Sequence, residues 1–225
     1  MTAARLLALD TSGTNALVAL GGADGTLLVE RRWLAGYRHG EELLTQIDRM
    51  LTAAGVEMAE LSGVVVGTGP GAFTGLRVGL ATAKGLAHGL GIPIAGVPTS
   101  EALLLAASLA GALEGPRAAL LLPAGPSDRV VVFEGKATLL RGGDEPELDA
   151  ATTLVAVDLP GRAPAEEAAR GQRAEAGLPA ALLRLGVARL ASGGDDVARL
   201  VPEYVTLPRG VPVAKGEVRW SHDHR

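Results

Sequence analysis

Two short segments carry residues of the kind that bind phosphate or a metal ion. The turn Asp10-Thr11-Ser12-Gly13 follows a strand-like run and offers a carboxylate, two hydroxyls and backbone N–H groups. The glycine-rich segment GTGPGAFTG (67–75) follows an apolar run and precedes a helical pattern, where N–H groups and the helix dipole attract anions. Both segments are therefore candidates for a nucleotide or phosphate site.

The glycine-rich segment fits neither of two common nucleotide motifs. A Walker A loop ends in Lys followed by Ser or Thr, and no lysine occurs before Lys84. Gly67, Gly69 and Ala72 fit a variant of the dinucleotide fingerprint, but Pro70 removes an N–H donor and the next strand lacks the acidic residue that binds ribose. The plainer interpretation is that the glycines only permit a tight turn.

Composition and spacing argue against several other kinds of site. The chain has no cysteine, which excludes disulfides and thiolate metal sites, and its four histidines form no H-x-x-x-H pair. It contains no G-x-S-x-G motif and no second copy of the Asp-Thr-Ser-Gly turn, as an aspartic protease within one chain would need. A net charge of −4 offers no excess positive charge for nucleic acid. We expect no metal, no cofactor and no autonomous RNA binding.

The helix expected at 74–90 has one face almost without side chains. Gly75, Gly79, Ala83 and Ala87 recur every four residues, whereas basic residues occupy the opposite side. Such a face allows another element to approach closely. Two interpretations stay open, packing against the sheet of the same domain and packing across a subunit interface.

Periodicity predicts the elements that position these segments. Three strands joined by short turns are expected first, then a helix, a buried strand, a second helix, a strand and a third helix. Shorter strands follow, then helical patterns at 164–170 and 178–192 and a last strand. The expected ranges are 5–12, 14–22 and 25–33 (strands), 39–55 (helix), 63–67 (strand), 74–90 (helix), 92–97 (strand), 99–112 (helix), and 117–123, 129–135, 136–142, 151–159 and 201–207 (strands).

This order predicts an α/β chain with the two-lobed fold of actin, Hsp70 and sugar kinases, with βββαβαβα in the first lobe and a reduced second lobe. The predicted domains are 1–113, 116–207 and a loosely ordered tail at 208–225, because Gly115-Pro116 is the best boundary. The longest apolar stretch, 102–113, is too short to span a bilayer, and the run before Asp10 is too short for a signal peptide. We expect a cytoplasmic protein that does not enter membranes.

Three segments together resemble one family. LLALDTS (6–12), HGEELLTQI (39–47) and above all GTGPGAFTGLRVGLATAKGLAHGLGIPIAGVPT (67–99) are similar to the TsaB (YeaZ) family, the accessory subunit of the bacterial machinery that makes threonylcarbamoyladenosine in tRNA. The segment VPEYVTLPRG (201–210) weakly resembles the end of that family. The resemblance is strong over the first hundred or so residues and loose beyond them.

The resemblance implies a scaffold and not an enzyme. The partner in that family, TsaD, carries the metal-binding histidines, which this chain lacks, and through TsaD the complex includes the ATPase TsaE. Family members pair with TsaD or with themselves through two helices, here 39–54 and 74–90, and contact tRNA only indirectly. The implied interface residues are Leu43, Ile47, Met50, Leu51, Gly75, Gly79, Ala83 and Leu86, and Asp10, Thr11, Ser12 and Gly13 are implied to be a vestigial nucleotide-binding turn.

Three other functions remain as alternatives. The chain could be a degenerate nucleotide-binding regulatory module, a small-molecule kinase of the actin-like superfamily, or a metalloprotease. The missing metal ligands argue against the protease. The turn that enters the second lobe, AGPSDR (124–129), lacks the acidic, glycine-rich phosphate turn of active superfamily members and so argues against the kinase.

Overall fold

A computed structural model describes residues 4–35 and 39–205 of the 225-residue chain, as nine strands, four α-helices and one short 3₁₀ helix. In chain order these are β1 (Arg5–Asp10), β2 (Asn15–Gly22), β3 (Leu27–Leu34), α1 (His39–Ala54), η1 (Met58–Glu60), β4 (Leu61–Gly67), α2 (Phe73–Leu90), β5 (Ile94–Val97), α3 (Thr99–Leu109), β6 (Arg117–Pro123), β7 (Arg129–Phe133), β8 (Lys136–Leu140), β9 (Thr152–Ala156) and α4 (Ala165–Ala191). The predicted tail, 208–225, lies outside the described residues.

The strands form two mixed sheets of the same type. The first sheet has the order β3-β2-β1-β4-β5, in which β1 pairs antiparallel with β2 and parallel with β4. The second sheet has the order β8-β7-β6-β9 and repeats this pattern, with β6 antiparallel to β7 and parallel to β9. A hairpin meander followed by a parallel crossover thus occurs twice, which is the predicted actin-like arrangement.

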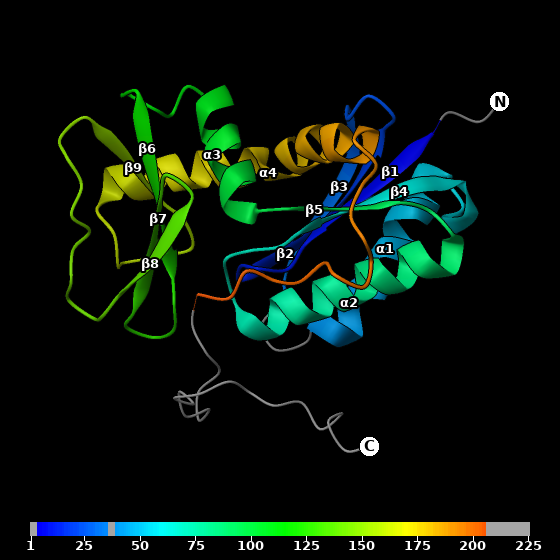
Figure 1. Ribbon diagram of the computed structural model, residues 1–225, viewed down its shortest axis with the longest axis horizontal. Coiled ribbons are helices and arrows are strands. Elements are labelled where there is room, and N and C mark those ends of the chain that lie inside the picture. Colours follow the sequence, from blue (N-terminus) through cyan, green and yellow to red (C-terminus); the bar gives the residue numbers. More distant parts are fainter. Residues whose placement is uncertain (1–3, 36–38, 206–225) are drawn as a thin grey trace, which may run out of the picture.

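One face of the first sheet is covered by α1 and α2, and the other by α4, against which α3 packs. Alternate residues of a strand point to opposite faces, so Leu7 and Leu9 of β1 pack with α1 and α2, whereas Leu6 and Ala8 pack with α3 and α4. Figure 1 shows α1 and α2 below the first sheet and α4 running above it toward the second sheet at the left. α1 and α2 are therefore neighbours on one side of the molecule.

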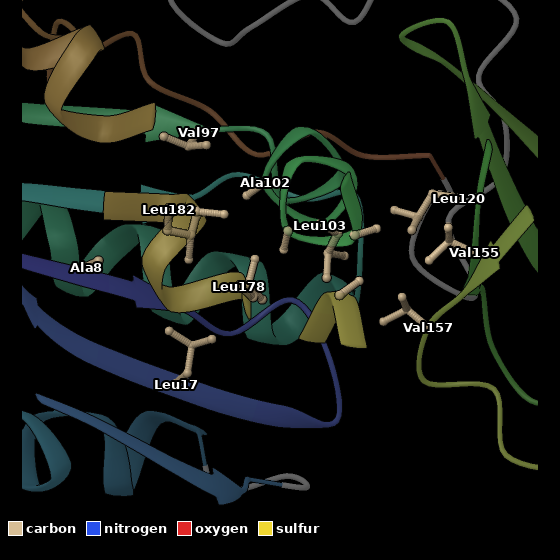
Figure 2. Close-up of a cluster of buried hydrophobic side chains, with 14 of the residues drawn as sticks. Ala8, Leu17, Val97, Ala102, Leu103, Leu120, Val155, Val157, Leu178 and Leu182 are labelled. Carbon is tan, nitrogen blue, oxygen red and sulfur yellow. The ribbon is translucent and has the colours of Figure 1, made fainter. Parts of the chain in front are cut away.

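One hydrophobic core joins the two sheets. Leu178 and Leu182 of α4 lie between Ala8 and Leu17 of the first sheet and Leu103 of α3 (Figure 2). The same cluster continues to Leu120, Val155 and Val157 of the second sheet. The predicted second domain, 116–207, thus contributes its long helix to the core of the first sheet, and the division at 113–116 stays a prediction.

The last helix differs from its prediction. The sequence pattern suggested two helices, 164–170 and 178–192, the second interrupted at Gly186, but α4 is continuous from Ala165 to Ala191. Pro179 lacks the N–H that Glu175 O would accept, and Arg32 replaces it by donating Nη1 to that oxygen (2.6 Å) and Nη2 to Ala176 O (2.7 Å). Gly186 does not interrupt the helix. It lets α4 pack closely on β4, because a Cβ at this position would lie 2.3 Å from Cγ2 of Val65.

The last predicted strand, 201–207, is also wrong over the residues that are described. Residues 201–205 do not form a strand. Glu203 N donates to Thr68 O (2.8 Å), but no ladder of strand pairs continues from this bond among the described residues. None of the described helices is long and apolar enough to cross a membrane.

Candidate functional site

Asp10, at the end of β1, is a buried carboxylate held inside the protein. Only 2% of the residue is exposed. Its Oδ1 accepts hydrogen bonds from Ser12 N (2.8 Å) and Ser12 Oγ (2.7 Å), and its Oδ2 accepts one from Thr99 Oγ1 (2.5 Å). Thr99 Oγ1 in turn accepts from Gly69 N (3.1 Å), so the carboxylate links the Asp10 turn to the glycine-rich segment and to the start of α3.

The surroundings of Asp10 favour its neutral form. Burial raises the pKa of the Asp10 carboxyl above its usual value and outweighs the opposing hydrogen bonds from Ser12 and Thr99. Gly67 makes room for the carboxylate, because a Cβ at position 67 would lie 1.7 Å from Asp10 Oδ2. Both oxygens thus have partners within the protein, and the group serves to hold three segments together.

The other residues of the predicted nucleotide turn also have partners within the chain. Thr11 Oγ1 donates to Gly75 O of α2 (2.7 Å), and Thr14 N donates to Oδ2 of Asp158 (2.7 Å), which follows β9. Gly13 lies next to this Asp158 carboxylate. The four predicted residues do lie together at the end of β1, where the side chains of Asp10 and Thr11 bind α3 and α2, and the backbone of the following Thr14 makes the bond to the second sheet.

A hollow of about 690 Å³ opens beside this turn. It is bounded by residues 12–14, the beginning of α2 at 72–74, the turn 123–126, and Asp158 and Arg162. Arg162 Nη1 donates to the carbonyls of Gly125 and Pro126 (2.9 Å each), so this guanidinium is already engaged by the second lobe. Among the described residues no group of three or more side chains is placed to hold a metal ion.

Most of the predicted interface residues lie in the interior of the chain. Leu43, Ile47, Met50 and Leu51 of α1 are between 0% and 3% exposed and form part of the core. The small-residue face of α2 is also turned inward: a Cβ at Gly79 would lie 2.2 Å from Thr11 Oγ1. Packing within the domain is therefore the interpretation that the structure supports for that face. The predicted residues buried in the described chain are Gly75, Gly79, Ala83, Leu43, Ile47, Met50 and Leu51, and Leu86 is partly buried.

The surface of α1 and α2 is instead formed by the opposite sides of these helices. On α2 the exposed stripe consists of Thr74, Arg77, Ala81, Gly85, His88 and Gly89. No atom lies within 4 Å of a Cβ built at Gly85 or Gly89, so the space in front of them is open. On α1 Leu44 is 54% exposed. These residues form the α1–α2 surface: Leu44, Thr45, Asp48, Thr74, Arg77, Ala81, Gly85, His88 and Gly89.

Sequence reasoning missed three residues that build the site. Thr99 is the first residue of α3, after the N-cap Pro98, and its hydroxyl binds Asp10 across 89 positions. Asp158 and Tyr204 also contact segments far away in sequence, Thr14 and Phe73 respectively. No local pattern marks such contacts, because they depend on how the two halves of the chain meet.

Comparison with known proteins finds relatives named for the threonylcarbamoyl modification of tRNA adenosine. A family model described as TsaD, tRNA N6-adenosine threonylcarbamoyltransferase, matches residues 33–201. The tRNA N6-adenosine threonylcarbamoyltransferase of Geotalea uraniireducens is 41% identical over 92 residues, which are 41% of this chain and 27% of that protein. The tRNA threonylcarbamoyladenosine biosynthesis protein TsaB of Escherichia coli is 37% identical over 95 residues, which are 42% of this chain and 40% of that protein.

The solved structure of YeaZ from Pseudomonas aeruginosa has the same fold. It is 24% identical in sequence and superposes with a TM-score of 0.63, covering 90% of this chain and 100% of the other. The sequence matches are shorter, and the matched segments span less than half the length of the two curated relatives named above.

Proposed function

This chain belongs to the TsaB/YeaZ family, whose fold is actin-like, and from that membership we propose that it is a non-catalytic subunit of a cytoplasmic complex that threonylcarbamoylates tRNA adenosine. The partner we propose is a TsaD-type actin-fold subunit that carries the active site. A TsaE-type ATPase would join through that subunit, and tRNA would be contacted only indirectly. In the free state two copies of this chain would pair through the same helices.

The observation that carries the proposal is the group of small exposed residues along α2. Ala81, Gly85 and Gly89 present little side chain to solvent, and Leu44 of the neighbouring α1 is an exposed apolar residue. Small residues on an exposed helix let the backbone of a second helix approach closely. Glycine also destabilises a helix by about 0.5–1 kcal/mol relative to alanine. Close packing against Thr11 explains the glycine at position 79, but Gly85 has no neighbour within the chain that requires a glycine.

The charges of α1 and α2 also suit the docking of a partner helix pair. α1 carries Glu41, Asp48 and Arg49 on its surface, whereas the charged side chains of α2 are all basic, among them the exposed Arg77. A partner with an equivalent helix pair, docked antiparallel, would place basic groups opposite acidic ones. Such complementarity steers association and fixes the orientation of the two subunits.

The state of Asp10 supports a non-catalytic role. Its two oxygens accept three hydrogen bonds from Ser12 and Thr99, so both oxygens are already engaged within the protein. We therefore propose that the Asp10 turn holds the molecule together and that the active site lies in the partner.

A Gly85→Arg substitution tests the proposed surface. We expect it to weaken binding to a TsaD-type subunit at least about tenfold, because a charged side chain would fill the space that the partner helix needs. The monomer should be no less stable, since arginine is a better helix former than glycine and Gly85 has open surroundings. Binding is measured by titration calorimetry and light scattering, with urea unfolding as the check on the fold.

Ala169→Arg provides the matched control. Ala169 is exposed on α4, at a distance from α1 and α2, so the same added side chain should leave binding unchanged. The proposal fails if Gly85→Arg forms the complex as tightly as the wild type, or if the wild-type chain and the partner do not associate.

A regulatory nucleotide site is a second candidate, favoured by the hollow of about 690 Å³ at the beginning of α2. N–H groups at the start of a helix attract anions, and residues 72–74 form one wall of this hollow. Titration of the isolated chain with ATP and with ADP distinguishes the two proposals. Binding that is lost in Thr74→Glu would support the nucleotide site, and the absence of any binding would remove it.

A further inference from the structure

The segment that follows α4 returns across the first sheet and ends beside α2. This segment, residues 195–204, is called the strap below, and it is the orange trace in Figure 1. At its first residue Asp195 N donates to Ile94 O (2.8 Å), and Asp195 Oδ2 accepts from Gly96 N (2.7 Å). Ile94 and Gly96 belong to β5, the edge strand, so the strap covers that end of the sheet.

The far end of the strap binds the segment that leads into α2. Glu203 N donates to Thr68 O (2.8 Å), and Thr68 Oγ1 donates to Glu203 Oε1 (3.0 Å). Between the two ends, Leu200 packs on Gly96, where a Cβ would lie 2.4 Å from Leu200 Cδ1. The strap is therefore fixed at both ends and in the middle.

An aromatic and cationic stack joins the strap to the first turn of α2. The ring centroids of Tyr204 and Phe73 are 4.8 Å apart with an angle of 33° between the rings. The guanidinium of Arg77 lies 5.2 Å from the centroid of the Phe73 ring. Tyr204 is 46% exposed and Arg77 is exposed, so the stack lies at the surface. Arg77 also belongs to the α1–α2 surface.

The first turn of α2 depends on such tertiary contacts. Its N-cap residue, Ala72, makes no side-chain cap hydrogen bond, and the turn has no acidic residue to compensate the helix dipole. On its inner side the turn is held by the bond from Thr11 Oγ1 to Gly75 O. On its outer side Phe73 is in contact with the strap through Tyr204.

We infer that the strap positions Arg77 through Tyr204 and Phe73, and that Arg77 in this position binds an acidic group of the partner. This inference rests on the function proposed above. Tyr204 is a positioning residue and does not need to touch the partner. An aromatic face attracts a cation above it, so a Phe73 ring held by Tyr204 restricts the guanidinium to one orientation. A restricted side chain loses less entropy when it binds.

A double-mutant cycle tests whether Tyr204 acts through Arg77. Tyr204→Ala and Arg77→Ala should each raise the Kd for a TsaD-type subunit about 2- to 10-fold, which is the range of one aromatic or cation–π contact. In the Arg77→Ala background Tyr204→Ala should have no further effect. Tyr204→Phe, which keeps the ring but not the hydroxyl, should bind as the wild type does. Additive effects of Tyr204→Ala and Arg77→Ala, or wild-type binding by Tyr204→Ala, would overturn the inference.

A measurement on the isolated chain separates this inference from the proposed function. In NMR spectra the side-chain resonances of Arg77 should be shifted by the ring current of Phe73, and the shift should disappear in Tyr204→Ala and persist in Tyr204→Phe. Val201→Ala is the control within the strap, because Val201 is 66% exposed. A shift that persists in Tyr204→Ala overturns the positioning by the strap. If the shift disappears as expected but the wild type binds no partner, the proposed function and the use of Arg77 fail while the positioning stands.

Discussion

At the scale of single residues, Asp10 shows how burial changes the role of a side chain. The sequence placed Asp10 where the first strand meets a turn, and in the structure it is the last residue of β1. It could not show that Thr99 approaches within 2.5 Å or that the missing Cβ of Gly67 makes room for the carboxylate, because both contacts join segments distant in sequence. The place of Asp10 along the chain was predictable from the local sequence pattern. Its pKa and its hydrogen-bond partners depend on the folded surroundings.

The raised pKa of Asp10 has a defined effect on stability. In the unfolded chain the carboxyl titrates near its ordinary value of 3.8, and in the folded chain it titrates at a higher pH because of burial. The folded state thus binds the proton more tightly, and the stabilising contribution is fully present below pH 3.8 and is lost as pH rises through the folded pKa. Each unit of pKa elevation is equivalent to about 1.4 kcal/mol.

Asp10→Asn should remove this pH dependence. We expect the stability of the wild type relative to Asp10→Asn to fall as pH rises above 3.8 and through the folded pKa of Asp10, measured by urea unfolding over a series of pH values. Asp24→Asn is a control of opposite sign, since the hydrogen bonds that Asp24 accepts from Thr26 lower its pKa and stabilise the protein above pH 3.8. Parallel stability curves for the wild type and Asp10→Asn would contradict the assignment.

At the scale of elements, periodicity identified the helices and strands but did not show which neighbour each face packs against. The four-residue spacing of Gly75, Gly79 and Ala83 correctly indicated close packing, yet the close neighbour is β1 and its following turn. In α4 the two predicted helices left out residues 171–177, but the helix is continuous there, and Gly171 lies against β9, where a Cβ would be 1.7 Å from Ala156 O. Glycine and proline have the same local signature whether they end a helix or accommodate a neighbour, so the tertiary contact decides.

The bond from Arg32 to α4 predicts a coupling between a strand and a distant helix. Arg32→Ala should destabilise the protein by about 1 kcal/mol, because it leaves the carbonyls of Glu175 and Ala176 without this donor. In a Pro179→Ala background residue 179 regains an N–H for Glu175 O, so the cost of Arg32→Ala should be smaller there by about 0.5 kcal/mol or more. Urea unfolding of the four variants measures the coupling.

Arg31→Ala is the comparison for this cycle. Arg31 lies beside Arg32 in β3, but its Nε donates to Gln46 of α1 and not to α4. The cost of Arg31→Ala should therefore be the same in the wild-type and the Pro179→Ala backgrounds. Equal costs of Arg32→Ala in both backgrounds would show that the donor and the proline are independent.

At the scale of the whole molecule, the repeated meander correctly predicted two sheets of related topology. The predicted boundary at 113–116 rested on Gly115-Pro116. Glycine and proline mark where a chain can turn, but they do not show which elements share a hydrophobic core. In the structure α4 packs on the first sheet, with Leu183 against Gly21 and Gly186 against Val65. A contact across more than a hundred positions leaves no local mark in the sequence.

A fragment ending at residue 113 should therefore not fold alone. Without α4, the face of the first sheet that includes Leu6, Ala8 and Leu17 would be open to water, and burial of such side chains contributes about 1.5–3 kcal/mol each for the larger ones. We expect fragment 1–113 to lack a cooperative thermal transition in circular dichroism. Mixing with a fragment 116–225 should restore one. A cooperative transition of fragment 1–113 alone would show that the first sheet is an independent domain.

The placement of α4 on the first sheet also bears on how the chain is made. Ribosomes synthesise the protein from its N-terminus, so β1 to β5 emerge long before residues 165–191, which provide the cover for one face of their sheet. During that interval the nascent chain presents a row of aliphatic side chains to water. Slowing of translation before α4 would lengthen the interval, and the growing chain would then depend on chaperones that bind exposed apolar segments.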